Sequence, residues 1–203
     1  MKVKEIKSYS RGRYKVCLEG EADFILYAKE LNKYDISEEK DLSEEDYREI
    51  MEEILIPRAK KRAMHLLEKM DRTEDNLEKK LSEGGYPKEA IDEAVSYVKS
   101  FNYVNDERYA QSYIRSYQGK RSKERIRTDL IQKGIDKEKI DAAMEETYVT
   151  DERTMIEELL RKRGFDPENA DRKDREKNYR FLASKGFKTD DILSVMKQCV
   201  TEL

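Results

Sequence analysis

Residue types that carry out catalysis are scarce in this chain of 203 residues. Its single histidine, His65, lies among Arg62, Ala63, Leu66 and Leu67 on an expected helix, and no motif for nucleophilic or metal chemistry surrounds it. An ordinary surface or half-buried histidine is the simpler interpretation. We therefore expect no catalytic residue, no metal and no cofactor, and a protein that is not an enzyme.

Two further patterns with chemical potential are incomplete. Glu83-Gly84-Gly85-Tyr86 lacks the Lys-Ser/Thr pair of a phosphate-binding glycine loop, and is better interpreted as a helix stop. Cys17 and Cys199 lie near opposite ends without Cys-x-x-Cys spacing, which favours neither a disulfide framework nor a zinc site and fits a reducing cytoplasm. The longest apolar run, Phe24 to Ala28, is too short to span a membrane.

The clearest candidate binding residues form a run of positive charge: Lys120, Arg121, Lys123, Arg125 and Arg127. On a helix that begins near Ser122, Lys123 and Arg127 lie four residues apart on one side. Ile126 and Leu130 supply the buried stripe, so we expect the basic groups to point outward. The run predicts contact with DNA phosphates or with an acidic protein surface; a merely solvated face is the alternative.

A second basic cluster, Arg58, Lys60, Lys61 and Arg62, supports the same prediction more weakly. The whole chain has 42 Lys and Arg against 45 Asp and Glu, but these charges are segregated. The segment 2–15 carries +5, the segment 19–55 carries −10, and the segments 57–72 and 119–134 carry +4 each. Such blocks favour a charged partner over a uniformly cationic nucleic-acid coat.

Three tyrosines, Tyr109, Tyr113 and Tyr117, recur every four residues and share one helix face next to the basic run. Such a ladder can stack on exposed nucleobases. Core packing is the simpler interpretation, because Tyr109 and Ala110 fall on the apolar pattern of the helix. Tyr117, which lies nearest the positive charge, is the best candidate for an exception.

An internal repeat organises the chain after residue 57. Leucine, glycine and isoleucine recur at constant gaps of four and six residues in three places: Leu81, Gly85 and Ile91; Leu130, Gly134 and Ile140; Leu182, Gly186 and Ile192. A second marker agrees, since Tyr103 to Arg108 returns as Tyr148 to Arg153. Each glycine is expected to end a helix in the left-handed conformation. The spacing predicts three units of three short helices, stacked as a curved solenoid.

Helix starts fit the same frame. Asp106 and Asp151 are expected N-caps, and Pro87, Asp136 and Thr189 are expected to open the helices that follow the glycines.

The segment before the repeats follows a different pattern. Residues 14–18 alternate between apolar and polar side chains, and with residues 23–26 they predict a small β-hairpin. Short helices are expected over about 27–34 and after Ser43, which has Asp46 three residues on. The segment 1–56 is therefore expected to be a separate appendage before repeats at 57–105, 106–150 and 151–203.

The repeat carries motifs that resemble the RecX family of regulatory proteins. They are Arg62-Ala63-x-x-x-Leu67, the frame from Leu81 to Ile91, Tyr103 to Ala110, and Leu130-x-x-Lys133-Gly134-Ile135 followed by Ile140. Two features depart from the family: Ser122-Lys123 stands where Gly-Pro is frequent, and the third unit carries a charged insertion, Asp166 to Lys177. The resemblance covers nearly the whole chain and is strongest from 58 to 145.

The resemblance implies a mainly α protein of tandem three-helix repeats that binds the RecA recombinase filament on DNA. It implies a regulator of homologous recombination, DNA repair and the SOS response, most often an inhibitor. From the net charge of −3 we expect direct contact with single- or double-stranded DNA to be weak, and we expect a monomer. Two alternatives stay open: a helical-repeat adaptor for another protein, and a DNA-binding protein without a recombinase partner. The segregated charge favours the filament, which offers both phosphates and protein surface.

Overall fold

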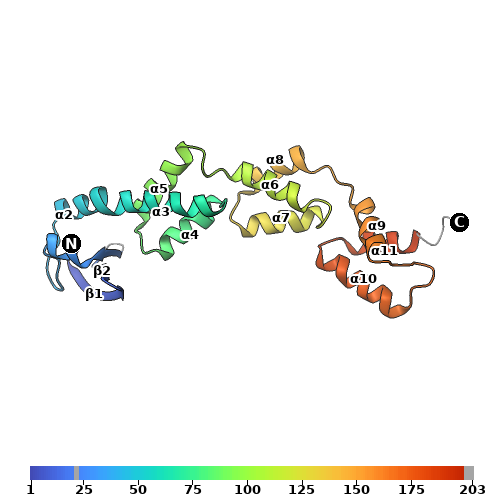
Figure 1. Ribbon diagram of the computed structural model, residues 1–203, viewed down its shortest axis with the longest axis horizontal. Coiled ribbons are helices and arrows are strands. Elements are labelled where there is room, and N and C mark those ends of the chain that lie inside the picture. Colours follow the sequence, from blue (N-terminus) through green and yellow to red (C-terminus); the bar gives the residue numbers. More distant parts are fainter. Residues whose placement is uncertain (21–22, 199–203) are drawn as a thin grey trace. The chain divides into compact units, whose positions relative to one another are not determined.

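The structure, a computed structural model, describes residues 1–20 and 23–198 (Figure 1). Its described part is mainly helical with one small antiparallel sheet, which confirms the predicted fold class. The chain divides into two compact units, Met1–Asn105 and Asp106–Leu203. The stacking of all three repeats into a curved solenoid stays a prediction.

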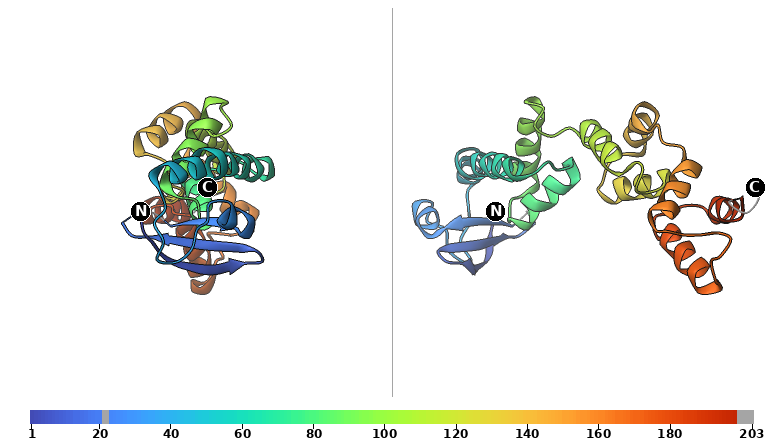
Figure 2. Two further views of the ribbon diagram at one scale, coloured as in Figure 1. Left: turned by 90° about the vertical axis from the view of Figure 1, so that its left-hand side faces the viewer. Right: turned by 45° about the vertical axis from the view of Figure 1, so that its right-hand side comes forward.

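The sheet has three strands in the order β1 (Val3–Ser10), β2 (Arg13–Leu18) and β3 (Phe24–Tyr27), which lie side by side (Figure 2). Strands β2 and β3 form the predicted hairpin, whereas β1 was not predicted. The register of β1 against β2 shifts between Val3 and Glu5 and again between Ser8 and Ser10. These irregularities interrupt the period-two pattern that marks a strand in a sequence.

A nearly continuous helical stretch connects the sheet to the first repeat. After α1 (Ala28–Lys33), the stretch comprises α2 (Glu44–Glu49), a π-helix η1 (Ile50–Leu55) and α3 (Ile56–Lys69). The Ser43 hydroxyl accepts a 2.9 Å hydrogen bond from the Asp46 backbone N–H, as predicted for an N-cap. The π-helix lies just before Pro57, which has no N–H to donate to the preceding turn. The boundary expected at residue 56 thus falls inside this stretch.

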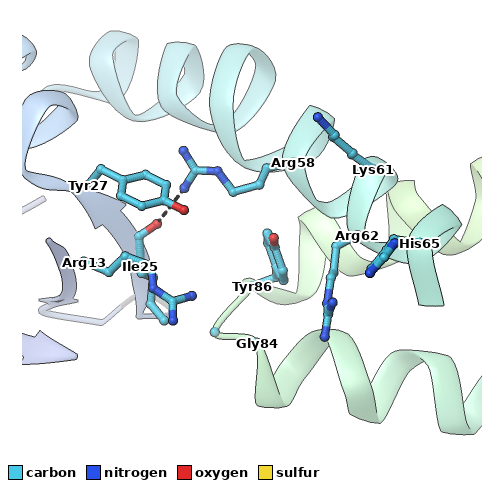
Figure 3. Close-up of a pocket in the computed structure, with 10 residues that line it drawn as sticks. Arg13, Ile25, Tyr27, Arg58, Lys61, Arg62, His65, Gly84 and Tyr86 are labelled. Atoms are coloured by element: carbon cyan, nitrogen blue, oxygen red, sulfur yellow. Dashed lines mark hydrogen bonds between the residues drawn. The ribbon is translucent and has the colours of Figure 1, made fainter. Parts of the chain in front are cut away.

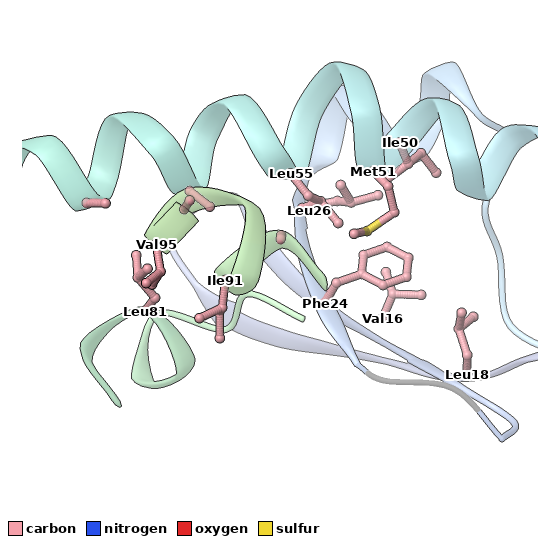
Figure 4. Packing of buried hydrophobic residues seen from close by; sticks show 14 of the residues in the cluster. Val16, Leu18, Phe24, Leu26, Ile50, Met51, Leu55, Leu81, Ile91 and Val95 are labelled. Carbon is pink, nitrogen blue, oxygen red and sulfur yellow. The ribbon is translucent and has the colours of Figure 1, made fainter. Parts of the chain in front are cut away.

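The N-terminal segment and the first repeat share one hydrophobic core. Phe24 and Leu26 from the sheet and Met51 and Leu55 from η1 belong to the same buried cluster as Leu81, in α4 (Glu74–Glu83) (Figure 4). The cluster continues through α5 (Lys88–Ser100). The structure therefore differs from the expected separate appendage, because neither part covers its apolar face alone.

The second unit contains the other two repeats. Its helices are α6 (Asp106–Tyr117), α7 (Lys123–Gln132), α8 (Lys137–Thr147), α9 (Glu152–Lys162), α10 (Arg172–Ser184) and α11 (Thr189–Gln198). Helices α6 to α8 enclose one hydrophobic cluster and α9 to α11 enclose another. Each three-helix repeat in this unit therefore has a core of its own.

The repeat frame is buried as predicted. The frame residues have exposed fractions of at most 4%: Leu81, Ile91, Leu130, Ile140, Leu182 and Ile192. Asp151 is the N-cap of α9, and its side chain accepts from the Thr154 backbone N–H. Asp106 is instead the first residue of α6, where it is buried with its carboxylate 3.8 Å from the Lys139 ammonium. Its expected role as an N-cap was therefore wrong.

The frame glycines end their helices in the left-handed region, with φ of 80° at Gly85, 80° at Gly134 and 88° at Gly186. Two of them also permit close contacts. A Cβ on Gly85 would overlap the Ile25 side chain of β3. A Cβ on Gly186 would lie 2.6 Å from the Arg125 Cβ and 2.7 Å from the Ser122 Oγ. Glycine is thus needed for both backbone conformation and packing.

We expect Leu130→Ala to destabilise the protein by about 2–5 kcal/mol, because it leaves a cavity in the core of the second repeat. Ile131→Ala is the matched control, since Ile131 is 51% exposed on the same helix and should change stability by less than about 0.5 kcal/mol. Urea denaturation measures both. Equal midpoints for the two variants would contradict the frame.

We expect Gly186→Ala to lower the free energy of unfolding more than Gly119→Ala does. Both glycines have positive φ, 88° and 81°, but nothing lies within 4 Å of a Cβ on Gly119. Gly119→Ala should therefore lower the free energy of unfolding by about 1–2 kcal/mol, which is the cost of holding alanine in the left-handed conformation. Gly186→Ala should add about 1–3 kcal/mol of overpacking against Arg125. Similar losses in thermal denaturation would show that the close contact has no energetic weight.

Candidate nucleic-acid and partner interface

The basic run predicted from the sequence lies at the start of α7. Ser122 is the N-cap of this helix, and its hydroxyl accepts from the Arg125 backbone N–H while donating a 2.7 Å hydrogen bond to the Gly186 carbonyl. Ile126 and Leu130 are fully buried, as predicted. The run is therefore held between the core of the second repeat and the glycine turn of the third.

The three arginines of the run are paired inside their own repeat. Arg121 and Arg125 both bind Asp129, the latter with 3.2 Å between Nε and Oδ1. Arg127 lies 2.9 Å from Asp141, and its side chain is only 27% exposed. The expectation that every basic group points outward was wrong for Arg121 and Arg127, which are half-buried against carboxylates of their own repeat, whereas Arg125 is exposed.

Lys120 and Lys123 are exposed, as Arg125 is, but neither lysine forms an ion pair within residues 1–20 and 23–198. The Lys120 ammonium donates a 2.9 Å hydrogen bond to the Ser116 carbonyl. The Lys123 ammonium lies 5.7 Å from the centre of the Tyr148 ring. These two lysines are the part of the run whose charge is not balanced by a carboxylate.

The tyrosine ladder packs against the core of the second repeat. The ring centroids of Tyr109 and Tyr113 are 6.4 Å apart, and those of Tyr113 and Tyr117 are 4.4 Å apart. All three rings are half-buried against the cluster. Burial, together with the negative charge of Asp129, raises the pKa of the Tyr113 hydroxyl to about 12. Core packing therefore accounts for the ladder, while Tyr117 also carries the Arg121 guanidinium 4.4 Å from its centroid.

The second basic cluster lies on α3, and two of its four side chains form ion pairs with carboxylates. Arg58 forms an ion pair with Glu30 and donates a 3.3 Å hydrogen bond to the Ile25 carbonyl. Lys60 lies 3.5 Å from Glu93. Lys61 and Arg62 are exposed and form no ion pair within the part of the chain that the structure describes.

Lys61 and Arg62 instead line a cavity of about 260 Å³ in the first unit (Figure 3). Arg13, Tyr27 and Tyr86 also line it, and sequence analysis did not select them. In the sequence, the positive charge of the segments 2–15 and 57–72 was the only indication of this cavity. That signal could not show that the strand and helix face each other, because their contact depends on sheet pairing and core packing.

His65 and Cys17 are two residues with chemical potential that sequence analysis considered and that the structure describes. His65 is exposed, with Nδ1 3.5 Å from the Glu68 carboxylate, as expected for a surface histidine. No group of three or more His, Cys, Asp or Glu within residues 1–20 and 23–198 is placed to hold a metal ion. Cys17 is half-buried, and Cys199 lies outside the described residues. Of the described helices, none has both the length and the apolar character that a membrane span requires.

Comparison with known proteins accounts for all three repeats. The family models of the first, second and third RecX three-helix domains match residues 59–97, 105–144 and 151–196. Regulatory protein RecX of Caldanaerobacter subterraneus subsp. tengcongensis is 32% identical over 189 residues, covering 92% of this chain and 93% of that protein. The corresponding protein of Clostridium beijerinckii is 27% identical over 197 residues, covering 96% and 92%.

Solved structures agree with this relationship. A crystal structure of regulatory protein RecX superposes with a TM-score of 0.60 at 25% identity, over 96% of this chain and 98% of that one. The crystal structure of RecX from Lactobacillus salivarius shows the same fold, with a TM-score of 0.56 at 24% identity over 72% and 97%. With three tandem domains matched and a relative at 32% identity across nearly its whole length, this chain belongs to the RecX family of regulatory proteins.

Proposed function

We propose that this protein binds the RecA recombinase filament on DNA and restrains recombination and ATP turnover by physical obstruction, without catalysing a reaction. The observation that carries the proposal is the match of three tandem RecX domains along the chain. Relatives that cover nearly the full length are regulatory proteins by name. Binding and inhibition of RecA are the step that we add.

The charge distribution supports a partner that is both nucleic acid and protein. Lys120 and Lys123 offer positive charge at the start of α7, and Lys61 and Arg62 offer it on α3. Exposed carboxylates gather in the first turn of α2, at Glu44 and Glu45. A nucleoprotein filament presents phosphates to the lysines and protein surface to the carboxylates. Bare DNA would leave the acidic segment without a role.

The proposed inhibition acts by obstructing movements and entry paths in the filament. A recombinase filament turns over nucleotide through relative movement of neighbouring protomers, and duplex DNA must enter its groove. A chain of three tandem domains has several separate docking surfaces, so it can contact more than one protomer. Contacts of this kind hinder protomer movement, and occupation of the groove excludes duplex DNA.

Co-sedimentation with RecA, single-stranded DNA and a non-hydrolysable ATP analogue tests the proposal. We expect the protein to sediment with the filament much more strongly than it binds the same DNA alone at the same salt. Binding to bare DNA should be weak and should fall steeply as salt rises, because few phosphates are contacted and the net charge of −3 opposes approach. Equal affinity for DNA and filament would favour a DNA-binding protein without a recombinase partner.

Charge reversal at Lys120 and Lys123 tests which surface makes the contact. The double change to Glu places negative charge where phosphate or acidic protein would lie, and should reduce the potency of strand-exchange inhibition at least about tenfold, or about 1.4 kcal/mol. Both side chains are exposed, so the melting temperature should be preserved. Arg127 is unsuitable for this test, since Arg127→Glu would face Asp141 at close range.

Lys173 and Lys177 provide the matched control. They lie four residues apart on α10, are exposed and form no ion pair within the described ranges. Reversal of both to Glu changes the same amount of charge in the third repeat and should leave inhibition nearly unchanged. If this control abolishes inhibition while the Lys120 and Lys123 variant behaves like the parent, the contact surface has been assigned to the wrong repeat.

A further inference from the structure

We propose that the cavity lined by Arg13, Tyr27, Arg58, Arg62 and Tyr86, here termed the arginine pocket, is a binding site for the phosphate group of a nucleotide. The pocket lies within the first unit and has a volume of about 260 Å³ (Figure 3). It needs no recombinase, so the inference goes beyond the proposed function.

Strands β2 and β3, helix α3 and the turn after α4 build the pocket. Arg13 of β2 and Tyr27 of β3 are direct partners in the antiparallel ladder, so their side chains begin from adjacent positions. Arg58 and Arg62 lie four residues apart on α3, one helical turn from each other. Tyr86 follows the glycine turn after α4, and Figure 3 shows its ring standing between the sheet residues and the residues of α3.

Packing holds these elements in fixed relation. The Gly85 turn lies so close to Ile25 that no Cβ fits between them. Arg58 crosses from α3 to the Ile25 carbonyl, and its guanidinium carbon lies 4.8 Å from the centre of the Tyr27 ring. The walls therefore belong to one core, and little conformational freedom has to be lost when an anion binds.

The pocket has an excess of positive charge. Arg58 is balanced by Glu30, but Arg13, Lys61 and Arg62 form no ion pair with a carboxylate within residues 1–20 and 23–198. None of the described lining residues is Asp or Glu. The same charges act on Tyr86: burial raises the pKa of its hydroxyl, and nearby Arg58 and Arg62 oppose that rise. Like charges gathered in a concave site attract an anion.

The side chains present match a nucleotide phosphate in particular. Planar guanidinium groups bind phosphate oxygens through paired, charge-assisted hydrogen bonds. Two tyrosine rings beside them offer surfaces on which a base can stack. A volume of about 260 Å³ lies just below the usual range for small-ligand sites, so the pocket has room for a single nucleotide unit, whether free or part of a strand.

Nuclear magnetic resonance titration of the full chain tests the site. The probes are inorganic phosphate, thymidine monophosphate and a twelve-residue oligothymidylate, each added to isotope-labelled protein at constant ionic strength. We expect saturable shifts of the Arg62, Gly84 and Gly85 backbone amides with thymidine monophosphate. Tighter binding of the oligonucleotide would identify a strand as the preferred source of the phosphate, and similar binding would identify the free nucleotide; both results support the pocket.

Arg62→Ala and Arg13→Ala should each weaken binding of thymidine monophosphate about tenfold, since each removes a charge-assisted hydrogen bond. Arg62 is exposed, so its variant should fold normally, and the spectrum itself reports folding. Arg115→Ala is the control, because it removes an exposed arginine of α6 from the other unit. The proposal is overturned if no probe shifts the pocket amides, or if Arg115→Ala weakens binding as much as the pocket variants.

Discussion

The close approach of glycine turns to neighbouring elements is the constraint on which both units depend. Gly85 carries the turn after α4 against Ile25 of the sheet, and Gly186 carries the turn after α10 against Ser122 and Arg125 of α7. In each case a positive φ reverses the chain and a missing Cβ lets the backbone make contact. The Ser122 hydrogen bonds to Gly186 and Lys185 form because this approach is so close. Turns that end helices thereby also join elements that lie far apart in the sequence.

Pairing of charges inside each of the two units determines how much of the cationic sequence reaches the surface. Asp129 is buried, a position that is costly for a carboxylate unless cations surround it, and Arg121 and Arg125 meet that requirement. Arg127 is likewise paired with Asp141, and Arg58 with Glu30. Much of the positive charge therefore stabilises the fold. Among the basic residues predicted from the sequence, Lys120, Lys123, Lys61 and Arg62 form no ion pair in the part of the chain that the structure describes.

The shared core of the first unit gives the N-terminal sheet a role beyond an appendage. Strands β2 and β3 supply one wall of the arginine pocket and α3 supplies another, so the pocket exists only when both parts are assembled. The acidic segment 19–55 lies in this same unit and provides Glu30, which orients Arg58. The first unit thus carries both exposed carboxylates, at Glu44 and Glu45 of α2, and the basic lining of the arginine pocket.

The sequence by itself determined the three-helix repeat, since leucine, glycine and isoleucine at constant spacing express local physics: helix periodicity and the need for a left-handed stop. It also determined family and fold class, as well as the burial of Leu130 and Ile140. Only the tertiary structure decided that β1 completes the sheet, that 1–56 shares a core with the first repeat, and that Arg127 turns to Asp141. Strand pairing, core sharing and ion pairing join residues distant along the chain, and a local pattern carries no record of which partner lies opposite.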